Sequence, residues 1–143
     1  TVDVMIDDEV ERPATIQPWA DPDWLTGDSM LIEAGESGVE HSFSFVLPTD
    51  VMIYTSALHM HKLGADARLK IDRADGSETC LLDIPEWDFN WQRTFLFEEP
   101  VLLESGDALT LECHWDNTTD EDVVWGDGTS DEMCLGTMYM SFP

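Results

Sequence analysis

The sequence predicts an all-β protein, an antiparallel jelly-roll-like β-sandwich with an irregular N-terminal arm. Short segments rich in β-branched and aromatic residues recur along most of the chain, which is the composition of strands. Clusters of Gly, Pro, Asp and Asn separate these segments and predict turns. Few stretches show the apolar periodicity of a helix. Short strands at this spacing are typical of sandwich folds.

The elements follow in order along a single domain. Residues 1–38 contain three prolines and are expected to form an irregular arm packed on the sandwich. The sandwich itself is expected to occupy residues 39–143. Its strands are predicted at 39–47, 51–61, 67–72, 79–84, 93–97, 108–115 and 138–142. The pairs Asp75-Gly76 and Gly106-Asp107 mark two of the turns between them.

Composition limits the classes of function. Hydrophobic residues make up 43% of the 143 positions, with six Trp and six Phe, so the chain is long and apolar enough to bury a core. Against this stand 31 acidic and 6 basic residues, a formal net charge of −25. Such a chain repels nucleic acids and anionic membranes, and we expect it to bind neither. Because the acids are spread along the whole chain, they are read as a strongly solvated, salt-adapted surface.

Neither a membrane-spanning segment nor a signal peptide is visible in the sequence. The chain begins at Thr1, so we expect a mature product or an excised domain.

Alternation along the predicted strands sorts the four histidines. In the 51–61 segment, His59 and His61 lie on one face together with Ile53, Thr55 and Ala57. The two imidazoles are therefore expected side by side.

The other two histidines are expected outside that pair. His41 falls on an apolar face and is expected to be a half-buried, hydrogen-bonded ring. His114 is expected to face solvent.

A soft metal site is the chemistry that this pair favours. Met133, in the run Asp131-Glu132-Met133-Cys134, would add a thioether to the two imidazoles. Such a set suits copper and is poor for calcium or magnesium. The plain structural alternative is a surface His-x-His with Met133 as core filler.

Three cysteines leave the pairing open, because an odd number cannot pair completely within the chain. Cys113 and Cys134 would enclose a loop of about 22 residues, worth roughly 3 kcal/mol if bridged. That bridge would fix Met133 beside the strand that carries Cys113. Three reduced, buried thiols are the alternative.

Four motifs together resemble a known family. They are His59-Met60-His61-Lys62-Leu63-Gly64, Trp87-Asp88-Phe89-Asn90-Trp91-Gln92, Gly106-Asp107 ahead of the strand with Cys113, and Gly126-Asp127-Gly128-Thr129-Ser130-Asp131-Glu132-Met133-Cys134. In order and spacing, from about Val39 to Met140, they are similar to the C-terminal domain of the copper type II, ascorbate-dependent monooxygenases. Peptidylglycine hydroxylating and dopamine β-monooxygenases are the animal members, and the Trp-Asp-Phe-Asn-Trp-Gln stretch is more similar to bacterial ones.

The resemblance implies a function and a site. His59, His61 and Met133 correspond to the ligands of the family's oxygen-binding copper, one ion per chain, and Cys113 with Cys134 to a family disulfide. The implied reaction is hydroxylation of a C–H bond in a small-molecule substrate, and the implied location is extracellular or periplasmic.

The aromatic motif has two readings. Asp88, Asn90 and Gln92 are expected either to hydrogen-bond the imidazoles from outside the metal's own ligands or to form a turn. Its three aromatic rings are expected to wall a pocket or to pack in the core.

Two departures from the family change the expectation. The family's second copper domain has no counterpart here, since only His41 and His114 are left over. The chain is therefore expected to be inactive alone and to need a second copper or redox domain as partner. Where peptide-amidating members place an arginine and a tyrosine for a substrate carboxylate, this chain has Ala57 and Thr137, so a peptide carboxylate is not the expected substrate.

Two other classes of function stay open. One is a stand-alone copper protein for storage, delivery or electron transfer; a blue-copper version would need a free cysteine, and Cys80 is the one left if the other two are bridged. The other is a metal-free or calcium-binding adhesion sandwich, with the acidic loops 116–120 and 127–132 as its binding loops.

Overall fold

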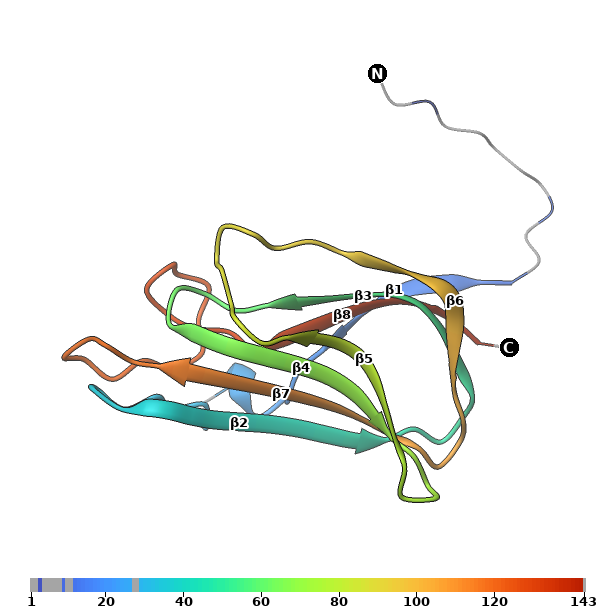
Figure 1. The fold of residues 1–143 in the computed structure, drawn as a ribbon, viewed down its shortest axis with the longest axis horizontal. Helices are drawn as coiled ribbons and strands as arrows, with labels where there is room; N and C mark the ends of the chain where they lie inside the picture. Colours follow the sequence, from blue (N-terminus) through green and yellow to red (C-terminus); the bar gives the residue numbers. More distant parts are fainter. Residues whose placement is uncertain (1–2, 4–8, 10–11, 27–28, 143) are drawn as a thin grey trace.

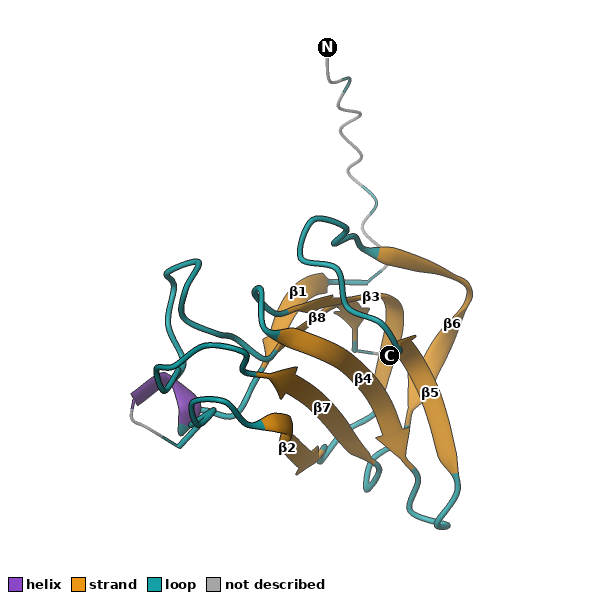
Figure 2. Cartoon of the chain, turned by 60° about the vertical axis from the view of Figure 1, so that its left-hand side comes forward, coloured by secondary structure: helices purple, strands orange, loops and turns teal. Residues whose placement is uncertain are grey.

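Two antiparallel four-stranded sheets lie face to face in this computed structural model, which describes residues 3, 9, 12–26 and 29–142 (Figures 1 and 2). The first sheet has the strand order β1-β8-β3-β6 and the second β2-β7-β4-β5. The elements are β1 (Ala14–Trp19), a short 3-10 turn (Trp24–Thr26), β2 (Ser37–Val46), β3 (Val51–His59), β4 (Gly64–Asp72), β5 (Glu78–Ile84), β6 (Phe95–Leu103), β7 (Ala108–Asp116) and β8 (Leu135–Ser141). The predicted all-β, jelly-roll-like sandwich is confirmed.

The core fills the space between the sheets. Ile53 and Leu58 of β3 face Leu69 of β4 and Leu111 of β7, and all four are buried. Buried and outward-facing side chains alternate along strands such as β4, as a sandwich requires. The remaining side chains of each strand form the two outer faces.

A regular strand lies inside the segment predicted as an irregular arm. β1 pairs with β8 along its whole length, from Ala14 opposite Ser141 to Trp19 opposite Gly136. The sequence concealed this strand because Pro18 interrupts it. Proline is tolerated there because β1 is at the edge of its sheet, where one side of the strand needs no hydrogen-bond donor.

The β6 strand is also longer than predicted. It runs to Leu103, whereas the sequence predicted a strand ending at residue 97. Pro100 hid the second half, and β6 is likewise an edge strand of its sheet.

A bulge interrupts the alternation of β3. Ile53 pairs with Met140 and Thr55 with Tyr139, so Tyr54 is an extra residue without an opposite neighbour. Ile53 is buried in the core, while Thr55 lies with Ala57 and His59 on the outer face. The prediction that Ile53 shares the face of the histidines is therefore wrong.

Within the described residues, no helix has the length and apolar character needed to cross a membrane.

Candidate functional site

The histidine motif lies at one end of the sandwich, where β3 stops and the chain turns into β4. Two further segments come to this end, namely the loop between β5 and β6 and the long loop between β7 and β8 (left side of Figure 1). The opposite end holds the shorter β2–β3, β4–β5 and β6–β7 turns. The longer loops thus gather around the histidines.

The two imidazoles are neighbours. His59 is the last residue of β3, and His61 follows it just beyond the strand. Their ring centroids are 5.1 Å apart, with the ring planes at 79°. His61 is only 5% exposed, whereas His59 is half-buried. One ion could therefore contact both rings from the solvent side of His59.

Hydrogen bonds fix the tautomer of each ring. The Nδ1 of His59 lies 2.6 Å from Oε1 of Gln92, and Gln92 Nε2 donates to the Phe89 carbonyl at 2.8 Å. The Nδ1 of His61 lies 2.8 Å from the carbonyl oxygen of Asp131. Since these oxygens only accept, both Nδ1 atoms carry the proton. In the neutral imidazole, a proton on Nδ1 leaves the lone pair on Nε2, which is the state that binds a metal.

Met133 lies two residues before β8, the strand that pairs with β3. The β3–β8 ladder ends with His59 opposite Leu135. If the same register continued two residues past His59 and two residues back from Leu135, Met133 would be opposite His61. The bond from His61 to the Asp131 carbonyl shows that the two segments stay adjacent beyond the ladder. Met133 therefore lies two residues before Leu135, the partner of His59, and its role as a third copper ligand stays a prediction.

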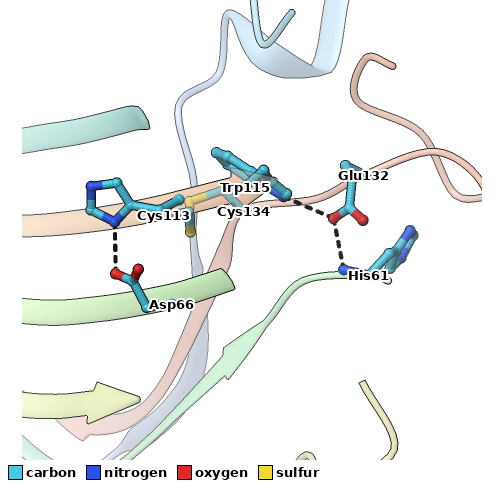
Figure 3. The surroundings of a disulfide bond; sticks show 7 residues. His61, Asp66, Cys113, Trp115, Glu132 and Cys134 are labelled. Carbon is cyan, nitrogen blue, oxygen red and sulfur yellow. Dashed lines mark hydrogen bonds and ion pairs between the residues drawn. A yellow bond between two sulfur atoms is a disulfide. The ribbon is translucent and has the colours of Figure 1, made fainter. Parts of the chain in front are cut away.

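The disulfide predicted from the family resemblance is present. Cys113 of β7 is bonded to Cys134, with Cα atoms 6.0 Å apart (Figure 3). It joins the two sheets directly beside Met133. The third cysteine, Cys80, is exposed on β5, in the same sheet as β7.

A buried carboxylate that sequence reasoning did not single out lies beneath the histidines. Glu132 is completely buried, and its Oε2 accepts the His61 backbone N–H at 2.8 Å and the Trp115 indole N–H at 2.9 Å (Figure 3). Its Oε1 accepts the Leu63 N–H at 2.7 Å. Glu132 therefore holds the chain on both sides of the turn after His61.

A signal for Glu132 was present in the sequence. Counting back along β8 by twos from the buried Met138 leads through Gly136 and Cys134 to Glu132. An acid at an inward position of this kind needs internal donors. By the same count, Met133 points to the outer face of the sheet.

The loop before Glu132 is tightly folded around a second carboxylate. Asp131 Oδ2 accepts the Gly128 N–H at 2.9 Å, and the Gly126 N–H donates to the Glu132 carbonyl at 3.1 Å. A methyl group at either glycine would collide with the Asp131 carboxylate. These glycines thus allow the close approach that places the Asp131 carbonyl against His61.

The aromatic motif lines the same end. The Trp87 indole donates to the His61 carbonyl at 3.0 Å, and the Phe89 ring meets His61 edge-on at 6.1 Å between centroids. Trp91 is 56% exposed, with the Arg93 guanidinium 5.4 Å from its ring centre. Two of the three rings therefore contact His61.

The polar residues of this motif divide in their roles. Asp88 accepts the backbone N–H of Asn90 at 2.8 Å and so closes a turn, while Gln92 bonds His59. Beside them lies an open groove of about 710 Å³, lined by Lys62 and residues 86–90.

The remaining histidines lie elsewhere. His41 is half-buried and bonds the Leu31 carbonyl at 2.9 Å. His114 lies on the outer face of the second sheet, with its Nδ1 2.7 Å from Asp66. In the part of the chain that the structure describes, no three His, Cys, Asp or Glu side chains are grouped to hold a metal ion.

The two positions that differ from the peptide-amidating members face each other. Ala57 of β3 and Thr137 of β8 are direct cross-strand partners, one step along the outer face from His59 and Leu135. Their small, uncharged side chains lie next to the histidine pair.

The chain is similar to one protein family and to several characterised proteins. The family profile described as "Copper type II ascorbate-dependent monooxygenase, C-terminal domain" matches residues 37–142. Human DBH-like monooxygenase protein 1 is 28% identical over 98 residues, which are 68% of this chain and 16% of the relative. Mouse DBH-like monooxygenase protein 2 is 32% identical over 61% of this chain and 14% of its own length. The chain thus spans about one sixth of these relatives or less.

Proposed function

Because this chain belongs to the copper type II ascorbate-dependent monooxygenase family, as its C-terminal domain, we propose that it holds one copper ion through His59, His61 and Met133. Its proposed role is the oxygen-activating half of a monooxygenase that hydroxylates a C–H bond in a small molecule. Family membership rests on the sequence match. The assignment of the ion to these residues is supported by the family resemblance and by the neighbouring positions of His59 and His61.

The observation that carries the proposal is the state of the two imidazoles. Both Nδ1 atoms are engaged with oxygen acceptors, and the two rings are 5.1 Å apart. Both Nε2 lone pairs are therefore available at neighbouring positions. A thioether from the facing segment would complete a soft set suited to Cu(I).

The surrounding residues have defined parts in this proposal. Gln92 and the Asp131 carbonyl keep the imidazoles in the ligating tautomer, and Glu132 holds the turn that carries His61. The disulfide keeps Met133 beside β7. When bound, copper would supply one-electron redox chemistry with dioxygen.

A partner that supplies electrons follows from the stoichiometry of the reaction. Hydroxylation of a C–H bond by dioxygen, with release of water, takes up two electrons and two protons. A single copper supplies one electron per cycle between Cu(I) and Cu(II). We therefore propose that a second copper or redox domain completes the enzyme and that this domain alone does not turn over.

An oxidising compartment fits the same proposal. The Cys113–Cys134 bridge joins the two sheets, and such structural disulfides persist outside reducing cytosol. We place the protein in an extracellular or periplasmic space.

A cysteine-ligated electron-transfer site is not favoured at the histidine pair. Two cysteines are bridged, and the free Cys80 belongs to the β2-β7-β4-β5 sheet, whereas His59 belongs to the other sheet. Blue-copper sites require a cysteine thiolate together with two histidines.

The test is copper stoichiometry on the reduced protein together with X-ray absorption of the bound metal. We expect one Cu(I) per chain with two nitrogen ligands and one sulfur ligand. In Met133→Ala, affinity for Cu(I) should fall far more than affinity for Cu(II), because the thioether prefers the softer ion.

Two variants serve as controls. Met52→Ala removes a methionine near the opposite end of β3, and His114→Gln removes a histidine from the other sheet. Both should bind copper as the parent does. A metal site without sulfur would contradict the assignment. So would a Met133→Ala variant whose affinities for Cu(I) and Cu(II) fall by the same factor.

A further inference from the structure

A series of aromatic rings runs through the core from the histidine end. The indole of Trp115 on β7 lies 5.7 Å from the imidazole of His41 on β2, measured between ring centroids. His41 lies 6.4 Å from Trp24 in the 3-10 turn, and Trp24 lies 6.4 Å from Trp125 in the β7–β8 loop. We call Trp115, Trp24 and Trp125, with His41 between the first two, the tryptophan series.

The inner end of the series is hydrogen-bonded to the histidine site. The Trp115 indole N–H donates to Glu132 Oε2 at 2.9 Å, and the same oxygen accepts the His61 backbone N–H at 2.8 Å (Figure 3). One carboxylate oxygen therefore connects the first ring of the series with a residue proposed as a copper ligand. The negative charge of this carboxylate favours the state of the Trp115 ring that has lost an electron.

The burial of the rings decreases along the series. Trp115 is completely buried and Trp24 is 4% exposed, whereas Trp125 is half-buried. The planes of the Trp24 and Trp125 rings are stacked at 27°. The series therefore begins in the dry interior and ends at a ring that solvent can reach.

Indole is among the side chains that lose a single electron most readily. Electrons pass between neighbouring rings without any covalent bond being formed or broken. Rings at these separations also pack together in ordinary cores. Packing alone, however, predicts rings that exchange no electrons, so the two roles can be separated by experiment.

We propose that the tryptophan series conducts single electrons from the surface to the histidine end and thereby protects the copper ligands from oxidation. The protective role rests on the function proposed above, whereas conduction by the rings does not. The oxidant is hydrogen peroxide that reacts at reduced copper. The reductant is a small molecule of the ascorbate class in the surrounding solvent.

Electrons and protons balance in this step. Peroxide takes up two electrons and two protons and gives two molecules of water. The first electron comes from Cu(I), which becomes Cu(II), and the second comes from Trp115. Trp24 then reduces Trp115, Trp125 reduces Trp24, and the reductant returns the electron to Trp125. Both protons come from solvent water.

The experiment places an oxidant at the histidine end of the complete chain without copper. A ruthenium polypyridyl photo-oxidant is coordinated to His59 in His114→Gln, which removes the histidine on the outer face of the other sheet. Peptide mapping confirms the labelled residue. After a flash in the presence of an electron acceptor, transient absorption detects tryptophan radicals and mass spectrometry locates the oxidised rings. We expect oxidation at Trp125.

Interrupting the series should move the site of oxidation. In Trp24→Phe, oxidation of Trp125 should be lost and oxidised Trp115 should accumulate. Trp91→Phe removes an exposed indole outside the series and is the matched control, which should leave oxidation of Trp125 unchanged. Because Trp24 is buried, Trp125→Phe is a second variant at a half-buried position, and its oxidation should stop at Trp24. Urea unfolding confirms that each variant is folded.

Two results would overturn conduction by the rings. One is oxidation confined to Trp87 and Trp91, the indoles of the aromatic motif. The other is undiminished oxidation of Trp125 in folded Trp24→Phe. Either result would show that the tryptophan series only packs the core.

The protective role is tested on the copper-loaded chain with peroxide and ascorbate. We expect more 2-oxohistidine at His59 and His61 in Trp125→Phe than in the parent, and equal amounts would overturn protection. Copper stoichiometry on the same samples stands apart. If no copper binds while the ruthenium label still oxidises Trp125, the proposed function fails and conduction by the series stands.

Discussion

Two buried carboxylates hold the two ends of the sandwich, and they do so with different partners. At the end opposite the histidines, Asp107 accepts the backbone N–H groups of Ala74 and Glu104 and forms an ion pair with Arg73 at 2.8 Å. At the histidine end, Glu132 accepts two backbone N–H groups and one indole N–H. Among the described residues, no Lys, Arg or His side chain forms an ion pair with Glu132.

The two carboxylates differ in whether a basic side chain balances their charge. The charge of Asp107 is balanced by Arg73, so this end is a closed structural clamp between the β4–β5 and β6–β7 turns. The charge of Glu132 lacks such a balance, and it lies next to imidazoles that present free lone pairs. A cation at His59 and His61 would supply the missing compensation.

Asp107→Asn should have the largest effect on stability. The change leaves the Arg73 guanidinium, whose side chain is 19% exposed, without its ionic partner. Breaking a largely buried pair on one side costs about 3 kcal/mol. Urea unfolding should show this loss, while affinity for Cu(I) stays at the parent value because the histidine end is untouched. If Asp107→Asn weakened Cu(I) binding as much as Glu132→Gln is expected to, the two carboxylates would not have different roles.

Glu132→Gln should lower both stability and copper affinity. The amide nitrogen must face at least one of the three N–H donors, which costs about 2 kcal/mol. The negative charge beneath the histidines is also lost. We expect a lower urea midpoint together with at least about tenfold weaker Cu(I) binding. Unchanged copper affinity in a folded variant would show that Glu132 is only structural.

The clamp should also respond to acid. Burial raises the pKa of Asp107, but the Ala74 amide, the Arg73 guanidinium and the Glu104 amide outweigh it, so the pKa lies below its ordinary value. Its stabilising contribution is therefore complete above the unfolded pKa of about 3.9 and is lost as pH falls through the folded pKa. The stability gap between parent and Asp107→Asn should be constant from about pH 7 to 5 and shrink below about pH 4. A gap that widens in acid would contradict this sign.

Gln92→Ala should have the smallest effect on stability and a selective effect on the site. The side chain is exposed, so the free energy of unfolding should change by about 0.5 kcal/mol or less. Affinity for copper should fall roughly tenfold, because His59 loses the acceptor that fixes its tautomer. Asn90→Ala, in the adjacent turn, is the control and should retain copper affinity.

Much of this site was visible in the sequence because it depends on local spacing. His59 and His61 are two residues apart on a strand, so the adjacent rings were predicted from spacing. The Cys113–Cys134 disulfide was predicted from the family resemblance. The partners of each ring were less visible. Gln92 was named together with Asp88 and Asn90, and only the folded loop shows that Gln92 bonds His59 while Asp88 closes the turn.

The parts that escaped prediction depend on contacts between distant segments. Glu132 is one of 31 acidic residues, and its burial is set by donors from Leu63 and Trp115. The β1 strand was hidden by Pro18, which is acceptable only because β1 is at the edge of its sheet. The composition of a segment does not indicate whether its strand will lie at the edge of a sheet. It also does not indicate which distant residues will donate hydrogen bonds to it.

The extra residue in β3 decides on which side of the protein the chemistry can happen. Ile53 and His59 are six positions apart, an even number, and an unbroken strand would point both into the core. Tyr54 changes that parity, so Ile53 points into the core while His59 points to the outer face. Deleting this single residue should turn His59 inward or force Ile53 out, which makes the count of residues in β3 as much a part of the site as the histidines themselves.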